Sequence, residues 1–123
     1  MTKSTSLFVQ AFWVRCRETI RPELDATVDQ LKHGGHDAHV ATQEVADEPD
    51  GLPDSGPALI LSVHPNHAAE RQTLTFRGDV ARHDVVISSS KGRSVHHALD
   101  ALELPVVKAE IAAFVTALLG PRP

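Results

Sequence analysis

Histidine is the residue type in this sequence best suited to chemistry, with eight copies among 123 residues. Imidazole titrates near neutral pH and ligates transition metals. Four histidines fall in two short groups, His36 with His39 and His64 with His67. If residues 36–45 and 58–64 pair as antiparallel strands, the start of the first lies beside the end of the second. The four imidazoles would then meet at one end of a sheet and hold zinc, nickel or copper.

The spacing of these histidines also supports a plainer interpretation, in which most of them are solvated. His36 and His39 differ by an odd number of positions, so in a regular strand they face opposite ways. His64 and His67 flank a Pro-Asn turn, where exposed polar residues are common. None of the spacings matches a tight metal motif such as H-E-x-x-H. The solvated interpretation is the stronger one, and a transition-metal site is the alternative.

A second candidate is the segment SSSKGRS, residues 88–94, whose hydroxyls and cations could bind an anion through Ser90, Lys91 and Arg93. It lacks the spacing of a nucleotide-binding loop, so a flexible surface loop is the favoured interpretation. No G-x-S-x-G motif accompanies the serines, and nothing fixes a base beside them. No reaction type is indicated, and the sequence favours binding over catalysis.

The elements that would position these residues centre on 57–89. Leu59, Leu61 and Val63 alternate with polar or smaller residues, and the same period of two recurs around Leu74 and Val85. Alternation over short runs predicts strands with one buried face. Short links make successive strands antiparallel neighbours. Residues 36–45 add a first strand, and 96–102 form either a fifth strand or an irregular turn.

Helical patterns flank this meander. Residues 6–33 carry an apolar stripe with a period of 3.6, built from Val9, Trp13, Cys16, Ile20, Leu24, Thr27, Val28 and Leu31 and widened by Phe12. Pro22 interrupts the segment, and we favour one kinked helix over a break at Arg21. Gly34 and Gly35 end it. A second helix begins at Pro105, with a stripe of Val107, Ile111, Phe114, Val115 and Leu118.

The predicted fold is therefore an α+β two-layer sandwich in one domain, residues 1–123. It comprises a long N-terminal helix, a four- or five-stranded antiparallel meander and a C-terminal helix, with both helices on one face. The stretch at about 46–57 holds prolines, glycines and acids and is expected to be a mobile acidic loop.

The amino-acid composition limits the classes of binding partner that we expect. The net charge of −4 and pI of about 6.0 provide no basic face for nucleic acid and no attraction to anionic membranes. The apolar run LFVQAFWV is too short to span a bilayer. Cys16 is the only cysteine, which favours a reducing, cytoplasmic location, and its place on the apolar stripe predicts a buried, inert thiol.

Three functions follow from these observations. The first is a binding or interaction domain, with a homodimer formed through the open sheet face that carries Ile60 and Val86. The second is a transition-metal-binding protein using the histidines. The third is a binder of small apolar ligands, with a pocket between helix and sheet, although the two helices offer enough apolar side chains to fill that space.

Overall fold

The computed structural model describes residues 3–43, 57–66, 70–79, 82–90 and 94–119. Apart from Pro57, the acidic loop expected at about 46–57 lies outside these ranges, and so do His67, Lys91 and Arg93. The predictions that fall on these residues therefore remain predictions.

The described chain runs helix, five strands, helix. The elements are α1 (Lys3–Arg15), the π-helical turn η1 (Cys16–Ile20), α2 (Arg21–His33), β1 (Asp37–Gln43), β2 (Ala58–His64), β3 (Gln72–Asp79), β4 (Asp84–Ser89), β5 (Ser94–Ala98), the 3₁₀ turn η2 (Leu99–Ala101) and α3 (Leu104–Leu119). All neighbouring strands pair antiparallel in the order β1-β2-β3-β4-β5. This arrangement confirms the predicted α+β fold with five strands. The range 96–102 is divided, because its first three residues belong to β5 and the next three form η2.

The loop predicted at 88–94 is wrong at both ends. Ser88 and Ser89 belong to β4 and Ser94 to β5, and Ser88 pairs directly with Ser94. Ladder pairing satisfies the backbone of these serines and overrides their weak preference for turns. Only the turn at Ser90 remains of the described part of that loop.

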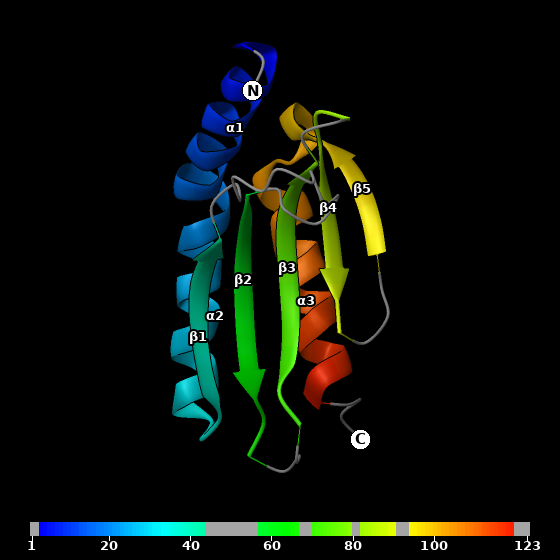
Figure 1. Cartoon of the computed structure of the whole chain (residues 1–123). Helices are drawn as coiled ribbons and strands as arrows, with labels where there is room; N and C mark the ends of the chain where they lie inside the picture. Colours follow the sequence, from blue (N-terminus) through cyan, green and yellow to red (C-terminus); the bar gives the residue numbers. More distant parts are fainter. Residues whose placement is uncertain (1–2, 44–56, 67–69, 80–81, 91–93, 120–123) are drawn as a thin grey trace.

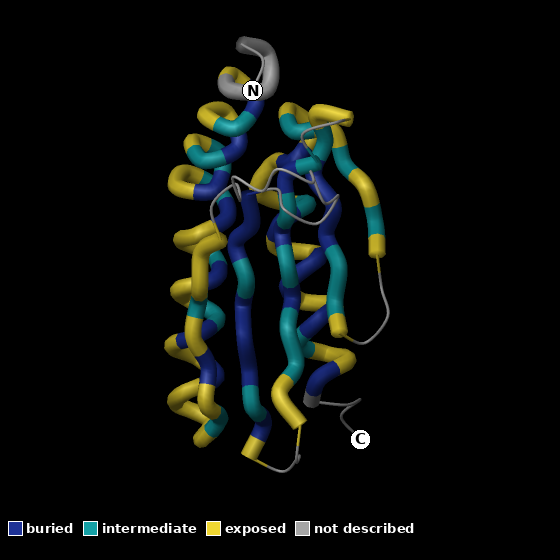
Figure 2. Tube along the Cα trace, viewed as in Figure 1, coloured by how far each residue is buried: buried dark blue, intermediate teal, exposed yellow. Residues whose placement is uncertain are grey.

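Both helical segments lie on one face of the sheet, which Figure 1 shows in front of them. The inward side chains of the helices and strands form one core cluster. The N-terminal helical segments contribute Phe12, Cys16, Ile20, Leu24, Val28 and Leu31, and the strands contribute Ala38, Leu59, Leu61, Val63, Leu74, Phe76, Val85 and Ile87. The rest of the cluster comes from the C-terminal part of the chain, namely Leu102 and, on α3, Val107, Ile111, Phe114 and Leu118. The buried stretches run along β2 and the inward sides of the helices (Figure 2). The predicted strand faces and the α3 stripe agree with this core.

The N-terminal helix is continuous through Pro22, and its irregularity is the π turn just before that proline. In η1 the amide of Arg21 donates to the carbonyl of Cys16, five residues back. A π turn holds one residue more than an α turn. The buried positions ahead of it are therefore Phe8 and Phe12, while the predicted Val9 and Trp13 are only half-buried. The sequence-based stripe was wrong by one residue there because it assumed an unbroken 3.6 period.

The predicted stop of this helix is confirmed. Gly35 adopts a positive φ of 91°, its amide donates to Lys32, and the amide of His36 donates to the carbonyl of Leu31. This is the Schellman arrangement, which needs a residue that tolerates the left-handed conformation. It turns the chain directly into β1 and fixes the position of His36 at the end of α2.

The sheet face away from the helices carries mostly polar side chains. Its two apolar residues singled out above are not exposed, because Val86 retains 5% of its accessible surface and Ile60 is half-buried. They therefore form no exposed apolar patch, which removes the reason for placing a dimer interface on this face. The dimer itself remains a prediction.

Candidate functional site

Described residues form a groove between α2 and α3 on the helical side of the molecule. It has a volume of about 710 Å³. We call it the helix groove, and its lining comprises Glu23, Ala26, Thr27, Gln30, Leu31, Gly34, His36, Lys108, Ile111, Ala112, Val115 and Thr116. Leu31 and Ile111 also belong to the core, so the floor of the groove is the outer surface of the core itself.

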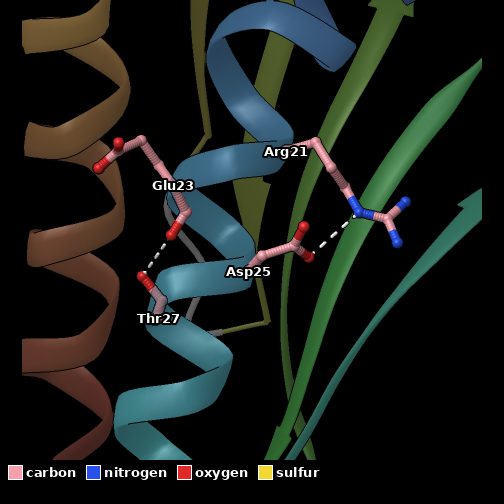
Figure 3. Close-up of polar contacts among 4 residues, drawn as sticks. All are labelled: Arg21, Glu23, Asp25 and Thr27. Atoms are coloured by element: carbon pink, nitrogen blue, oxygen red, sulfur yellow. Dashed lines mark hydrogen bonds and ion pairs between the residues drawn. The ribbon is translucent and has the colours of Figure 1, made fainter.

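One end of the helix groove carries opposite charges. Glu23 projects from α2 towards α3 in Figure 3, and Lys108 lines the same groove from α3. Neither side chain has an ion-pair partner among the residues described. The hydroxyl of Thr27 donates to the carbonyl of Glu23 at 2.8 Å, which keeps that hydroxyl against the helix backbone. A ligand at this end therefore meets a carboxylate and an ammonium that are both available.

Glu23 is not held by the nearby ion pair on α2. Arg21 and Asp25 bind each other, with 3.2 Å between Nε and Oδ1 on the exposed side of the helix (Figure 3). This pair is exposed and adds little to stability. Because Arg21 pairs with Asp25, it does not pair with the carboxylate of Glu23 in the helix groove.

The other end of the helix groove is closed by His36. Its Nδ1 accepts a hydrogen bond from the amide of Asn66 at 3.0 Å. The contact joins the end of α2 to the turn after β2, and a ring that accepts at Nδ1 carries its proton at Nε2. The turn at Gly34 and Gly35 that ends α2 thus places the His36 imidazole at this end of the helix groove.

The predicted meeting of β1 and β2 is present, but it divides the histidines between two sides. Asp37 pairs with His64 and His39 with Ser62, so His39 and His64 share the open sheet face with Asp37. His36 instead lines the helix groove. His36, which precedes β1, therefore lies on a different side of the sheet from His39 and His64 in this structure.

Among the residues that the structure describes, no group of three or more His, Cys, Asp or Glu side chains is placed to hold a metal ion. His67, the fourth member of the predicted site, lies outside them. The transition-metal site at His36, His39, His64 and His67 stays a prediction.

The open face near His39 and His64 carries a small polar network. Arg71 donates through Nη2 to Asp37 at 2.7 Å and through Nη1 to the hydroxyl of Ser62 at 3.0 Å. The hydrogen bond from Arg71 is the main reason that the pKa of Asp37 lies below its usual 3.8, with charge attraction from Arg71, His39 and His64 adding to it. Because Arg71 donates hydrogen bonds to both Asp37 and Ser62, these two side chains have a structural role here.

Of the predicted anion loop, only Ser90 is described. Its amide donates to the carbonyl of Thr73, and its hydroxyl donates to Oε1 of Gln72 at 2.6 Å. The amide of Thr73 donates back to the Ser90 hydroxyl at 2.9 Å. These bonds tie the end of β4 to β3, and the role of Ser90, Lys91 and Arg93 in anion binding stays a prediction.

Cys16 lies in the core cluster, as expected. Burial raises the pKa of its thiol to about 12. A thiol protonated at neutral pH is a poor nucleophile. Cys16 is therefore a packing residue.

Two polar contacts of β5 were not predicted. Glu110 on α3 is 8% exposed and lies 3.9 Å from Nε2 of His97 on β5, and that nitrogen is buried without a hydrogen-bond partner. On the other face of β5, Nδ1 of His96 lies 3.6 Å from Asp84. The sequence offered one signal for the first contact, since Glu110 falls among the apolar positions of the α3 stripe.

A second groove lies between α1 and the strand ends. Its volume is about 670 Å³, and we call it the α1 groove; its lining comprises Phe8, Ala11, Val14, Arg15, Glu18, His83, Ala98, Leu99 and Asp100. The rings of Phe8 and His83 stack with centroids 5.1 Å apart. No chemistry-bearing motif points to this groove, and sequence reasoning missed it.

Comparison with known proteins identifies no relative. No family model, curated protein or solved structure matches the chain. Among the residues described, no helix has the length and apolar content needed to cross a membrane.

Proposed function

We propose that this chain is a small-molecule binding domain and that the helix groove is its ligand site. The observation that carries the proposal is a concave volume of about 710 Å³ with an apolar floor and polar ends. Ligand sites commonly measure about 300–1,000 Å³ and combine apolar walls with a few polar groups. The sequence-based version of this function placed the pocket between helix and sheet, where the core cluster lies; the helix groove lies between the two helices instead.

The lining defines the chemistry of the ligand. Leu31, Ile111 and Val115 offer hydrocarbon contact, and Glu23 and Lys108 offer opposite charges at one end. A ligand with a single charge would be attracted by one of these groups and repelled by the other. A zwitterionic head satisfies both, with its amine on Glu23 and its carboxylate on Lys108. We therefore expect an apolar chain with a zwitterionic head.

The length of the groove limits the apolar chain. Lys108 and Thr116 line the groove from the same helix and are separated by roughly 12 Å, at 1.5 Å per residue. A decyl chain has a comparable length. A matched panel of 2-aminodecanoic acid, decanoate and decylamine therefore varies the head group while it keeps the chain constant.

Calorimetric titration with this panel tests the proposal. We expect 2-aminodecanoic acid to bind most tightly, and we expect Glu23→Gln or Lys108→Met to abolish its advantage over the two singly charged compounds. Each lost charge contact should cost about tenfold in affinity. Binding of none of the three compounds would contradict the proposed function.

A pair of adjacent alanines supplies the control. Ala112 lines the helix groove and Ala113 does not, and both are exposed on α3. Leucine has nearly the helix propensity of alanine, so neither Ala112→Leu nor Ala113→Leu should unfold α3. Ala112→Leu should fill the groove and abolish binding, while Ala113→Leu should leave it unchanged. Equal affinities of the two variants would place the ligand elsewhere.

A further inference from the structure

The helix groove has a second polar end, opposite the end that carries Glu23 and Lys108. Because α2 and α3 run in the same direction, residues late in both helices lie at the same end of the groove (Figure 1). On α2, Gln30 follows Glu23 by seven residues. On α3, Thr116 follows Lys108 by eight residues. A rise of 1.5 Å per residue puts the second pair roughly 10–12 Å along the groove from the first.

Gln30 and Thr116 offer hydrogen bonds that no other described residue uses. Both residues are exposed, and neither side chain makes a hydrogen bond within the part of the chain that the structure describes. A glutamine amide and a threonine hydroxyl can each donate and accept. They line the groove from different helices. One polar group of a ligand can therefore be bound from both walls at this end.

The imidazole that closes this end carries no charge in the hydrogen-bonded state. The amide of Asn66 donates to Nδ1 of His36, and this bond requires an unprotonated Nδ1. The opposite edge of the ring lies over Gly34, where an added Cβ would come within 3.3 Å of Cδ2. Among the described residues that line the groove, the charged side chains are then Glu23 and Lys108, both at the first end.

We propose that the ligand of the helix groove carries a second polar group at the far end of its apolar chain, and that this group is an uncharged primary amide held between Gln30 and Thr116. The inference rests on the proposed function and adds the identity of the other end of the ligand. A primary amide has two donor hydrogens and an acceptor oxygen. It therefore complements two side chains that each donate and accept.

A charged group fits this end less well. A carboxylate has the shape of an amide but only accepts hydrogen bonds, and no cationic side chain lines the described part of this end. The carboxyl-terminal ends of both helices also lie here, and their partial negative charge repels an anion. An ammonium group would likewise find no carboxylate among the described lining residues at this end. The neutral group is thus selected over either ion.

A second matched panel tests the far end while it keeps the head group and the chain length constant. 2-Aminodecanoic acid ends in a methyl group, 2-aminodecanedioic acid ends in a carboxylate, and the distal monoamide of that diacid ends in a primary amide. In calorimetric titrations with the full chain, the monoamide should bind about fivefold more tightly than 2-aminodecanoic acid. The diacid should bind no more tightly than 2-aminodecanoic acid.

A double variant assigns the advantage of the amide to these two side chains. Gln30→Met and Thr116→Val nearly keep the side-chain shapes and remove the hydrogen-bonding groups. The double variant should bind the monoamide and 2-aminodecanoic acid equally. Its affinity for 2-aminodecanoic acid should match that of the parent, which shows that the groove is still folded. Gln10→Met makes the same glutamine change at an exposed position of α1 outside the groove and should retain the fivefold advantage.

The results separate this inference from the proposed function. Binding of 2-aminodecanoic acid with no advantage for the monoamide would overturn the inference and leave the proposed function intact. An advantage that the double variant retains, or a diacid that binds most tightly of the three, would overturn it in the same way. Failure of all three compounds to bind would contradict the proposed function, and the inference with it.

Discussion

Arg71 connects three strands at one end of the sheet. Its guanidinium lies just ahead of β3 and binds Asp37 on β1 and Ser62 on β2. The pKa of Asp37 is lowered mainly by this hydrogen bond. A carboxyl group with a lowered folded-state pKa stabilises the native state above its unfolded-state pKa and loses that contribution as pH falls through the folded-state value.

Substitution of Asp37 by asparagine should therefore change the pH dependence of stability. We expect Asp37→Asn to be less stable than the parent chain at neutral pH, because Arg71 loses its charged partner. The difference should begin to close as pH falls to 3.8 and should vanish below the lowered pKa of Asp37, where the parent carboxyl is also protonated. Urea unfolding at a series of pH values measures it.

Asp29→Asn on α2 is the matched control, since its carboxylate is exposed and has no ion-pair partner among the residues described. Its stability relative to the parent should change far less as pH falls from neutrality to below the lowered pKa of Asp37. If Asp37→Asn behaved in the same way, the Arg71 contact would not exist in solution.

Sequence reasoning located the neighbours at this end of the sheet but did not sort them by face. The antiparallel pairing of β1 with β2 was considered for these two successive strands, and it brings Asp37 beside His64. The side that His36 occupies depends on the Schellman turn at Gly35, which fixes where the helix stops and the strand begins. A shift of one residue at such a boundary moves a side chain to the other face.

At the scale of elements, the π turn keeps two apolar faces in register. Phe8 and Phe12 precede it, Cys16 and Ile20 are its first and last residues, and Leu24 and Val28 follow it, always four residues apart. A regular α-helix would carry a stripe of that spacing progressively around its surface, because 3.6 residues make a turn. The extra residue of η1 corrects this drift. Packing on the sheet selects the π turn, so a local period could not predict it.

Removal of one residue from η1 should convert the π turn into a regular α turn without moving either apolar face. We expect deletion of Thr19 combined with Pro22→Ala to fold with a melting temperature near that of the parent. Pro22 has to be replaced, because proline inside a regular helix costs about 3 kcal/mol. Deletion of Asp25 with the same Pro22→Ala change is the control, since it rotates one part of the helix against the other by about 100°. Equal melting temperatures of the two variants would mean that η1 has no role in register.

The helix groove illustrates what patterns within single elements leave out. The stripes predicted for both helices contain Leu31, Ile111 and Val115, which form its floor. Whether two helices on one sheet close over such residues or leave a groove depends on their separation. That separation is set by the strands on which each helix packs, and no periodicity within α2 or α3 encodes it. Glu23 and Lys108 were therefore not singled out.

At the scale of the molecule, one core joins both helical segments to the sheet. Phe12 of α1 and Phe114 of α3 belong to the same cluster. A chain of this size with a single core is expected to unfold in one cooperative step. Loss of packing under α3 should therefore destabilise α1 equally.

Trp13 makes this cooperativity measurable, because it is the only tryptophan, it lies on α1 and it packs against the core. Phe114→Ala removes a buried ring from α3 and should lower the free energy of unfolding by about 3–5 kcal/mol. Both the Trp13 fluorescence and the far-ultraviolet circular dichroism should report this loss with the same urea midpoint. An unchanged fluorescence midpoint beside a lowered dichroism midpoint would contradict a shared core. It would show that α1 unfolds independently of the layer that α3 completes.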